Sequence, residues 1–432
     1  MPEKLPEGKW QRSVVTGKTA AMVGGKVLRY LSKKPFLSEG EQKVEKKKLE
    51  EASAKTIFKG LVLLKGTALK IAQALSLESG IIPDEIRAEL EKSYNQVPPM
   101  NRVLVRKVLK IAFHQEPDKV FKMFDMVAVA AASLGQVHKA VGQNGEVLAV
   151  KVQYPGISET IKSDIQMMKA LMRPLPEYQL VLPSLLEIEK RLKEEVDYSI
   201  EAGNINLFRD FLMDSDICVP SVYPDYSSTT VLATQFVEGK TIDAWLKDGR
   251  SQNERDHLAN TLYQLFIDGF YKHRCIHADP NPGNYIITDE NKLCLVDFGC
   301  VKHFSKTFIA DHQQLIKTIL EKNSQNYIPI LQKLNVITSE LSEPDRIALS
   351  PLIAEVMSWY RQLYQGTYFD FNKNGDFLKS GRELMSDLFS YRKNFAPNAE
   401  FVFLDRTRYG LFRLFESMVA NVKMNNRYES GG

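Results

Sequence analysis

Apolar and polar residues alternate along residues 127–153 in a pattern that predicts two paired strands. The segment VAVAAASLGQVHKAV is followed by the turn at 143–146 and then by VLAVKVQ. An Asn-Gly pair between two alternating runs is a strong signal for a β-hairpin. Pro155 and Gly156 predict the end of the second strand. A further buried strand is expected at 229–236.

Most of the remaining chain has the three-to-four-residue periodicity of helices. One helix over 185–213 is predicted from four apolar residues at this spacing: Leu185, Ile188, Leu192 and Val196. Helices are also expected at 10–36 and 43–78, and through most of the chain after Glu238. The tail beyond Arg406 is expected to be helical and to fray at 429–432.

One exception in the C-terminal part is the segment NYIITDENKLCLVDFG, which predicts two short strands around residues 289–292. Together these elements predict an α+β protein in three parts. We expect an N-terminal helical extension at 1–124, a strand-rich lobe at 125–236 and a mainly helical lobe at 237–432.

Composition excludes several classes of protein. Of 432 residues, 44% are apolar and 25% are charged, which argues against general disorder. The net charge of +4 gives no argument for a nucleic-acid partner. No two of the four cysteines form a C-x-x-C pair, which argues against a zinc ribbon or redox motif. We interpret all four as packing residues in a reducing compartment.

No secretory signal or apolar run of membrane-spanning length is present in the sequence. We therefore expect a cytoplasmic protein, with an organellar matrix left open. The basic residues at 10–36, among them Lys18, Lys26, Arg29, Lys33 and Lys34, leave two interpretations of the first helix. It is either an amphipathic helix that touches anionic lipid or a solvated helix packed on the main body. The thin apolar face favours the second interpretation.

The segment HADPNPGN, residues 277–284, carries the most informative pattern of polar residues. Asp279 and Asn284 are five residues apart, and Asp297 opens the sequence DFG after the predicted hairpin. Phosphoryl transfer needs metal ligands for the nucleotide and an acid near the acceptor, and protein kinases use this order and spacing. The simpler interpretation, a helix cap and a turn, must explain the whole constellation by chance. Prolines and Gly283 predict a rigid loop rather than a helix.

Lys151 lies in the middle of the apolar strand VLAVKVQ, where an unpaired charge is costly to bury. Kinase folds use such a lysine to hold the α- and β-phosphates and pair it with a glutamate on a helix. The candidate acids on the following helix are Glu194, Glu195, Asp197 and Glu201. On a straight helix Asp197 and Glu201 share a face and Glu195 does not, so the acids can serve two partners.

The loop expected to cover the phosphates precedes that strand and is rich in alanine instead of glycine. Alanines restrict the backbone and oppose close wrapping of phosphates. The residues expected to contact the nucleotide are Ala131, Ala132, Ser133, Gln136, Lys151 and Glu238. Upstream, Lys70 and Gln73 are spaced so that they share a helix face.

These motifs resemble those of the UbiB/AarF family of atypical kinase-like proteins, also called Coq-eight or AarF-domain kinases. The likeness covers residues 60–300. It rests on Lys70-Ile71-Ala72-Gln73, AAASLGQV, AVKVQYPG, Glu195-Val196-Asp197, HADPNPGN and Asp297-Phe298-Gly299. Two positions depart from the family pattern: Ala72 replaces a glycine, and Asn281 replaces a histidine.

The resemblance implies an atypical protein-kinase-like two-lobe fold with a family-specific N-terminal helical extension. It implies that Glu201 pairs with Lys151, and that Lys70 pairs with Glu195 or Asp197 so that the Lys70–Gln73 helix covers the site. It further implies ATP or ADP with Mg²⁺ or Mn²⁺ held by Asn284 and Asp297, and Asp279 as the catalytic carboxylate. ATPase activity at a membrane surface, quinone-biosynthesis partners and a role in ubiquinone or other isoprenoid-lipid metabolism are implied as well.

Two alternatives remain open at this point. A conventional Ser/Thr or small-molecule phosphotransferase would share the H-x-D segment and the later aspartate, but would not require the other motifs. A non-catalytic nucleotide-binding regulator is opposed by the intact Lys151, Asp279, Asn284 and Asp297, although an intact site does not prove turnover.

Overall fold

The computed structural model describes residues 9–38, 40–42, 44–46, 48–49, 52–53, 55–56, 100–132, 134–173, 178–389, 391–396 and 398–429. The chain forms two compact units. The first consists of residues 1–200 and 223–235, and the second of residues 201–222 and 236–432. The three-part division at 124 and 236 stays a prediction.

The first unit is built on one antiparallel sheet in the order β1-β2-β3-β4. Its strands are β1 Met123–Ala132, β2 Gly135–Val141, β3 Val147–Gln153 and β4 Val231–Gln235. The predicted hairpin is confirmed, since β2 and β3 pair on either side of Gly145, whose φ of 94° suits glycine. The predicted buried strand at 229–236 is β4.

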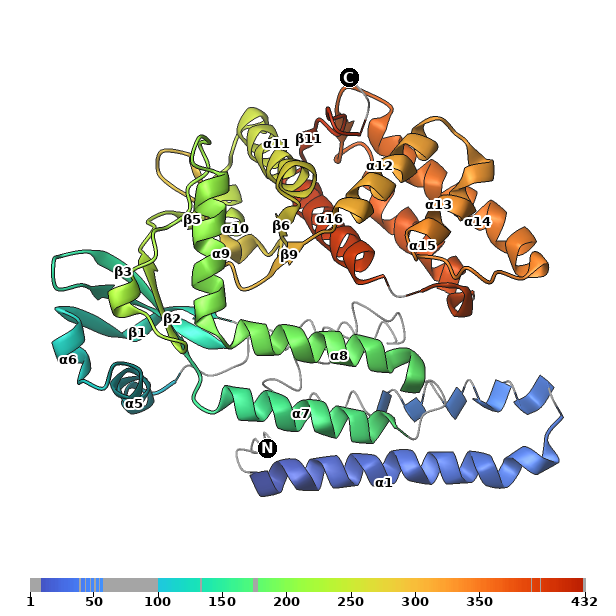
Figure 1. Cartoon of the computed structure of the whole chain (residues 1–432), viewed down its shortest axis with the longest axis horizontal. Helices are drawn as coiled ribbons and strands as arrows, with labels where there is room; N and C mark the ends of the chain where they lie inside the picture. The colour runs from blue at the N-terminus through green and yellow to red at the C-terminus, as the bar shows by residue number, and fades with distance from the viewer. Residues whose placement is uncertain are drawn as a thin grey trace. The chain divides into compact units, whose positions relative to one another are not determined.

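In the described part of the first unit, the helices with defined bounds are α1 Lys9–Lys33, α5 Arg102–Phe113, α6 Pro117–Val120, α7 Ile157–Met172, α8 Tyr178–Glu195 and the start of α9 Tyr198–Phe211, with short 3₁₀ turns at η1 Lys34–Phe36 and η3 Pro224–Tyr226. One face of the sheet is covered by α5, where Val105 and Leu109 pack with Leu148, Val150 and Phe121. In Figure 1, α1, α7 and α8 run beside one another. The first helix therefore packs on the body, although Leu28 and Phe36 remain exposed.

The second unit is mainly helical, as predicted. Its helices are α10 Ile242–Leu246, α11 Gln252–Asp268, α12 Lys306–Leu320, α13 Tyr327–Lys333, α14 Glu343–Arg361, α15 Phe377–Phe389 and α16 Ala399–Ser417, together with the π-turn η4 Gly269–His273 and the 3₁₀ turns η5 Pro282–Asn284, η6 Ser324–Asn326, η7 Gln362–Tyr364 and η8 Arg392–Asn394. Its strands are β5 Lys240–Thr241, β6 Cys275–His277, β7 Tyr285–Ile287, β8 Leu293–Leu295, β9 Val301–His303, β10 Phe369–Asp370 and β11 Asn421–Val422. The predicted hairpin around 289–292 is confirmed as β7 and β8.

The single helix predicted over 185–213 is wrong, because α8 ends at Glu195 and α9 begins at Tyr198. The Asp197 carboxylate accepts hydrogen bonds from the backbone N–H and the hydroxyl of Ser199, at 3.0 and 2.6 Å. Aspartate at this position satisfies the first free N–H groups of a new helix. The argument that Asp197 and Glu201 share a face of one straight helix therefore fails.

The helical tail predicted beyond Arg406 is also only partly correct. Helix α16 ends at Ser417, and the chain continues as β11, which pairs with β10. The tail does not fray at Glu429, which is buried and accepts hydrogen bonds from Tyr271 and Tyr364. A buried carboxylate with three donors, including Asn426, anchors this end of the chain.

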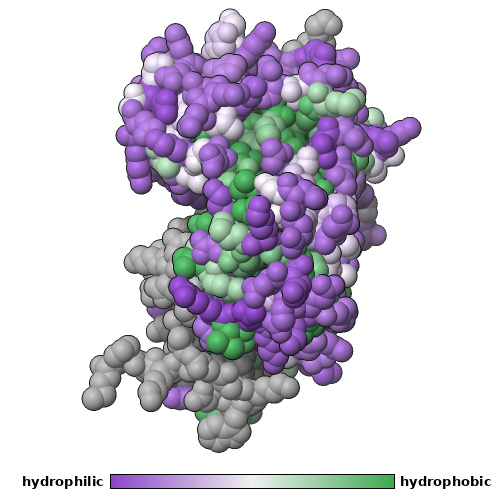
Figure 2. All heavy atoms as spheres, turned by 90° about the vertical axis from the view of Figure 1, so that its left-hand side faces the viewer, coloured by the Kyte–Doolittle hydropathy of each residue, from purple (hydrophilic) through white to green (hydrophobic). Residues whose placement is uncertain are grey.

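Hydrophilic side chains cover most of the face drawn in Figure 2, with smaller apolar areas between them. Among the described residues, no helix combines the length and the apolar character needed to cross a membrane.

Candidate nucleotide site

The segment between β6 and β7 holds Asp279 and Asn284 against each other. The Asn284 side-chain amide donates to the Asp279 carboxylate at 2.9 Å and to its backbone carbonyl at 3.2 Å. Asn281, one of the two departures from the family pattern, accepts a hydrogen bond from the N–H of Gly283 and so caps the 3₁₀ turn η5. The segment is thus a loop with one short turn, in which Asn281 supports the backbone.

The DFG segment is fixed by hydrogen bonds to its own backbone. The Asp297 carboxylate accepts a hydrogen bond from Gly299 N–H at 2.9 Å. His277 Nε2 lies at hydrogen-bond distance from the Asp297 carbonyl oxygen, so Nε2 carries the proton. Behind the segment, β6 and β9 pair, and Ala278 donates to the carbonyl of Cys300. Asp279 and Asp297 are both half-buried.

Helix α9 holds the central residue of DFG by both backbone groups. The Glu201 carboxylate accepts from Phe298 N–H at 3.4 Å, and the Asn204 side chain donates to the Phe298 carbonyl at 3.0 Å. Glu201 was expected at the site, but Asn204 was not. The spacing of three residues, which places both on one face of the helix, was the signal that could have indicated it.

Helix α16 lies against the loop that carries Asp279. A Cβ atom added to Gly410 would overlap the ring of Pro280. The absence of a side chain at Gly410 thus permits close contact between the helix and the loop. Tyr285, directly after η5, is buried, and burial together with the charge of Asp279 raises its pKa.

In the first unit, Lys151 lies on β3 with its ammonium 5.2 Å from the ring centroid of Tyr198. Gly135 packs closely here, because an added Cβ would overlap the Val152 carbonyl oxygen and lie 2.9 Å from the Tyr198 hydroxyl. A cation over an aromatic ring is electrostatically stabilised. The pairing of Lys151 with Glu201 stays a prediction.

The alanine-rich segment is less of a loop than the sequence suggested, since β1 continues through Ala132 and β2 begins at Gly135. Ala131 is exposed and Ala132 half-exposed, whereas Ser133 lies outside the described residues. Gln136 is buried, and its side chain already accepts from Met100 N–H and contacts His138.

The remaining predicted residues are spread over other segments. Glu238 is exposed in the connection between β4 and β5. Lys70 and Gln73 lie outside the described residues, so the covering helix stays a prediction. Glu195 ends α8, and Asp197 caps α9.

The donor set of the second unit suits a hard cation. Asp279, Asn284 and Asp297 offer oxygen atoms, which Mg²⁺ prefers, and Mg²⁺ commonly takes one or two carboxylates plus phosphate oxygens. A cluster of three acidic, histidine or cysteine ligands does not occur in the described part of the chain. The oxygen atoms of Asp279, Asn284 and Asp297 fit a Mg²⁺ ion that also takes phosphate oxygens.

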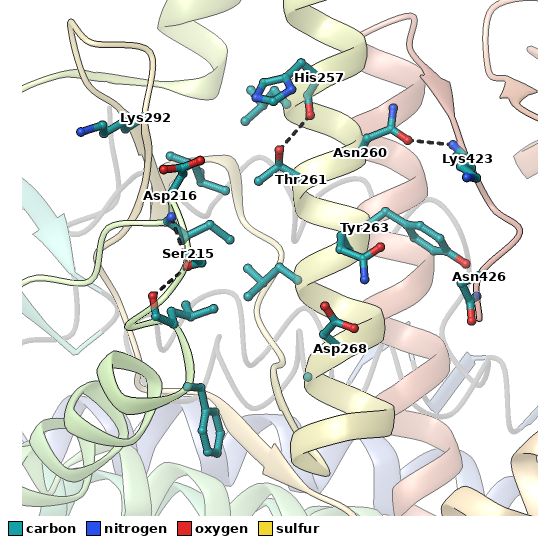
Figure 3. Close-up of a pocket in the computed structure, with 18 of the residues that line it drawn as sticks. Ser215, Asp216, His257, Asn260, Thr261, Tyr263, Asp268, Lys292, Lys423 and Asn426 are labelled. Atoms are coloured by element: carbon teal, nitrogen blue, oxygen red, sulfur yellow. Dashed lines mark hydrogen bonds between the residues drawn. The ribbon is translucent and has the colours of Figure 1, made fainter. Parts of the chain in front are cut away.

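A cavity of about 1400 Å³ lies elsewhere in the second unit. Figure 3 shows α11 between the segment that carries Ser215 and Asp216 and the tail that carries Lys423 and Asn426. Asp279, Asn284 and Asp297 do not line it. This cavity is therefore separate from the predicted catalytic residues.

Comparison with curated proteins gives relatives at about 30% identity. The Caenorhabditis elegans protein named atypical kinase coq-8, mitochondrial, is 32% identical over 67% of this chain and 40% of its own length. The rat protein named atypical kinase COQ8B, mitochondrial, is 31% identical over 67% of this chain and 56% of its own length. The chain thus spans about half the length of these relatives.

Among solved structures, the Mycobacterium tuberculosis protein Rv3197, described in complex with erythromycin, matches with a TM-score of 0.61 and 26% identity. The match covers 90% of this chain and 96% of that one, and it confirms the α+β kinase-like fold. The family model described as ABC1 atypical kinase-like domain matches residues 92–331. The expected family is thereby confirmed, and the chain belongs to the ABC1, or UbiB/AarF, family of atypical kinase-like proteins.

Proposed function

We propose that this chain binds ATP with Mg²⁺ and acts as an ATPase that supports ubiquinone or other isoprenoid-lipid metabolism at a membrane surface. The proposal rests on the arrangement of three polar residues in the second unit. Asp279 and Asn284 are hydrogen-bonded to each other in one rigid loop, and Asp297 opens a DFG turn held by α9.

Each residue has a role that suits its chemistry. Asn284 and Asp297 would offer oxygen ligands to Mg²⁺, which when bound neutralises the charge of the phosphates. Lys151 would bind the α- and β-phosphates, with Glu201 as its partner. Asp279 would accept the proton of the attacking water or hydroxyl.

Hydrolysis, rather than transfer to proteins, is favoured by the alanine-rich segment and the predicted cover. Alanine at 131 and 132 opposes close wrapping of phosphates by the backbone. The helix carrying Lys70 and Gln73, if it covers the site as the resemblance implies, would exclude a peptide substrate. We therefore do not assign protein phosphorylation in trans to this chain.

The test measures Mg-dependent nucleotide binding and phosphate release from ATP without a protein acceptor. Asp297→Asn should abolish both, because an amide is a weaker ligand for Mg²⁺ than a carboxylate. Asp289→Asn is the matched control, since Asp289 is an exposed acid in the turn between β7 and β8. If Asp297→Asn binds Mg-ATP like the parent, the metal assignment is wrong.

The lipid role is tested separately by adding vesicles of anionic or neutral phospholipid, with and without a phenol that resembles a quinone precursor. We expect phosphate release to rise with anionic vesicles. Turnover that is unaffected by lipid, combined with phosphorylation of an added small molecule or protein, would instead favour a conventional phosphotransferase. Nucleotide binding without phosphate release would favour a regulator.

A further inference from the structure

Two cysteines that are distant in sequence lie directly opposite each other in the second unit. Cys218, in the segment after α9, forms a parallel β-bridge with Cys294 in β8. The Cys218 N–H donates to the Leu293 carbonyl at 2.8 Å, and the Leu295 N–H donates to the Cys218 carbonyl at 3.0 Å. Paired strands lie about 4.8 Å apart, which is within the Cα separation of about 4.4–6.8 Å that a disulfide spans.

The two thiols differ in a way that suits stepwise oxidation. Cys218 is half-exposed, whereas Cys294 is fully buried. The neighbouring Cys294 thiol lowers the pKa of Cys218, and the positive charges of Lys292 and Arg209 contribute to this lowering. A thiolate is the reactive form of cysteine, so Cys218 is the sulfur that reacts first.

The two other cysteines do not share this arrangement. Cys275 is buried, and burial raises its pKa to about 12, which keeps it protonated. Cys300 is half-exposed like Cys218, but no β-bridge pairs it with another cysteine in the described part of the chain. Cys300 therefore serves as the control for a half-exposed cysteine outside this β-bridge.

The cavity shown in Figure 3 brings solvent to the chain segments that carry the pair. Ile217 and Leu293, each adjacent in sequence to one of the cysteines, line this cavity, as do Asp216 and Lys292. Cys218 and Cys294 themselves do not line the cavity, so an oxidant reaches the pair through the half-exposed Cys218.

We propose that Cys218 and Cys294 form a modification site at which a hydroperoxide produces an intramolecular disulfide. The Cys218 thiolate attacks the terminal oxygen of the hydroperoxide, so that an S–O bond forms, the O–O bond breaks and the alkoxide leaves as an alcohol after taking a proton. The Cys294 sulfur then attacks the Cys218 sulfenic sulfur. An S–S bond forms, and the hydroxyl leaves with the Cys294 proton as water.

The two thiols together lose two electrons and two protons, and a dithiol reductant reverses the reaction by thiol–disulfide exchange. The new bond would join the segment after α9 to β8, which leads directly into Asp297. Because α9 also holds Phe298, the disulfide would constrain the elements that position the DFG turn.

The experiment treats the full chain with hydrogen peroxide, and in parallel with an organic hydroperoxide. Remaining thiols are then alkylated, and the digest is analysed by non-reducing peptide mass spectrometry. We expect a peptide pair linked through Cys218 and Cys294, two hydrogens lighter than the separate peptides and lost after dithiothreitol. If no such pair forms while Cys300 becomes oxidised, the proposal is wrong.

Variants test the order of events. In Cys218→Ser the linked pair should be absent, whereas in Cys300→Ser it should form as in the parent. In Cys294→Ser the sulfenic acid at Cys218 should persist and be captured by dimedone. Because Cys294 is buried, the fold of its variant is first checked by thermal melting. If that variant does not fold, the presence or absence of the linked peptide pair in the parent protein tests the proposal. Dimedone capture at Cys300 that exceeds capture at Cys218 would overturn the assignment.

Discussion

Asn204 and Phe298, which are 94 positions apart, are joined by a hydrogen bond of 3.0 Å from the Asn204 side-chain amide to the Phe298 backbone carbonyl. One helical turn earlier, Glu201 accepts from the N–H of the same residue. One face of α9 therefore holds both polar backbone groups of the central residue of DFG. The position of Asp297, the preceding residue along the chain, depends on this contact.

Asn204→Ala should weaken Mg-dependent nucleotide binding as well as stability. The change leaves the carbonyl of the buried Phe298 without this donor, which costs about 1–3 kcal/mol. Chemical denaturation measures the free energy of unfolding, and calorimetry measures nucleotide affinity. Asn206→Ala, on an exposed position of the same helix, is the control. Equal affinities for the parent and both variants would show that α9 does not position the turn.

Gly410→Ala should destabilise the protein although alanine favours helices. In the interior of a helix, glycine to alanine normally gains about 0.5–1 kcal/mol. At Gly410 the new methyl group would overlap Pro280, and overpacking costs about 1–3 kcal/mol. We expect a lower melting temperature together with reduced phosphate release, because Pro280 follows Asp279.

Gly203→Ala provides the matched control for that change. Gly203 lies in the interior of α9, and an added Cβ would have no atom within 4 Å. This variant should be more stable than the parent by about 0.5–1 kcal/mol. A lower free energy of unfolding for Gly410→Ala and a higher one for Gly203→Ala would support the contact between α16 and Pro280. A Gly410→Ala variant that is more stable than the parent would contradict it.

Asp197 is expected to act as a helix cap. Asp197→Ala should cost about 1 kcal/mol, because the Ser199 N–H loses its acceptor. Asp197→Asn should retain most of the stability, since asparagine caps as well as aspartate. If the predicted pairing with Lys70 is the main role of Asp197, the asparagine variant should instead lose as much as alanine. Melting curves of the two variants distinguish these roles.

A buried polar chain in the second unit predicts a dependence of stability on pH. Arg408 lies 3.2 Å from His312 Nε2, and because arginine only donates, the neutral His312 carries its proton on Nδ1. Nδ1 lies 2.9 Å from the Tyr271 hydroxyl, which donates to the Glu429 carboxylate at 2.8 Å. Burial, followed by the charge of Arg408, lowers the pKa of His312 well below its ordinary value.

Below pH about 6.5 the unfolded chain binds a proton at His312 that the folded chain does not bind. The free energy of unfolding should therefore fall as pH falls from 7 to 5, with a contribution of at most about 1.4 kcal/mol per pH unit. In His312→Gln this contribution should disappear, whereas His257→Gln, an exposed position on α11, should keep it. Parallel pH profiles for the parent and His312→Gln would contradict the prediction.

Features that depend on neighbouring residues were predictable from the sequence. The hairpins around Gly145 and at 289–292 follow from alternation and turn residues, and both were confirmed. Asp279, Asn284 and Asp297 lie within 19 consecutive residues. The loop that carries the first two and the hairpin that leads to the third were therefore predictable as well. The break between α8 and α9 was missed, because Asp197 was considered as a partner for a cation and not as a cap.

The sequence by itself thus determined the family, the local elements and the types of residue at the site, because these follow from short-range backbone preferences and side-chain chemistry. Only the tertiary structure decided that Asn204 holds Phe298, that Gly410 meets Pro280, and that Cys218 faces Cys294. It also decided that Glu429 belongs to a buried hydrogen-bond network and not to the fraying end of a helix. Such contacts join residues that are far apart along the chain, and their partners are selected by packing and by the need to satisfy buried polar groups, which no local pattern records.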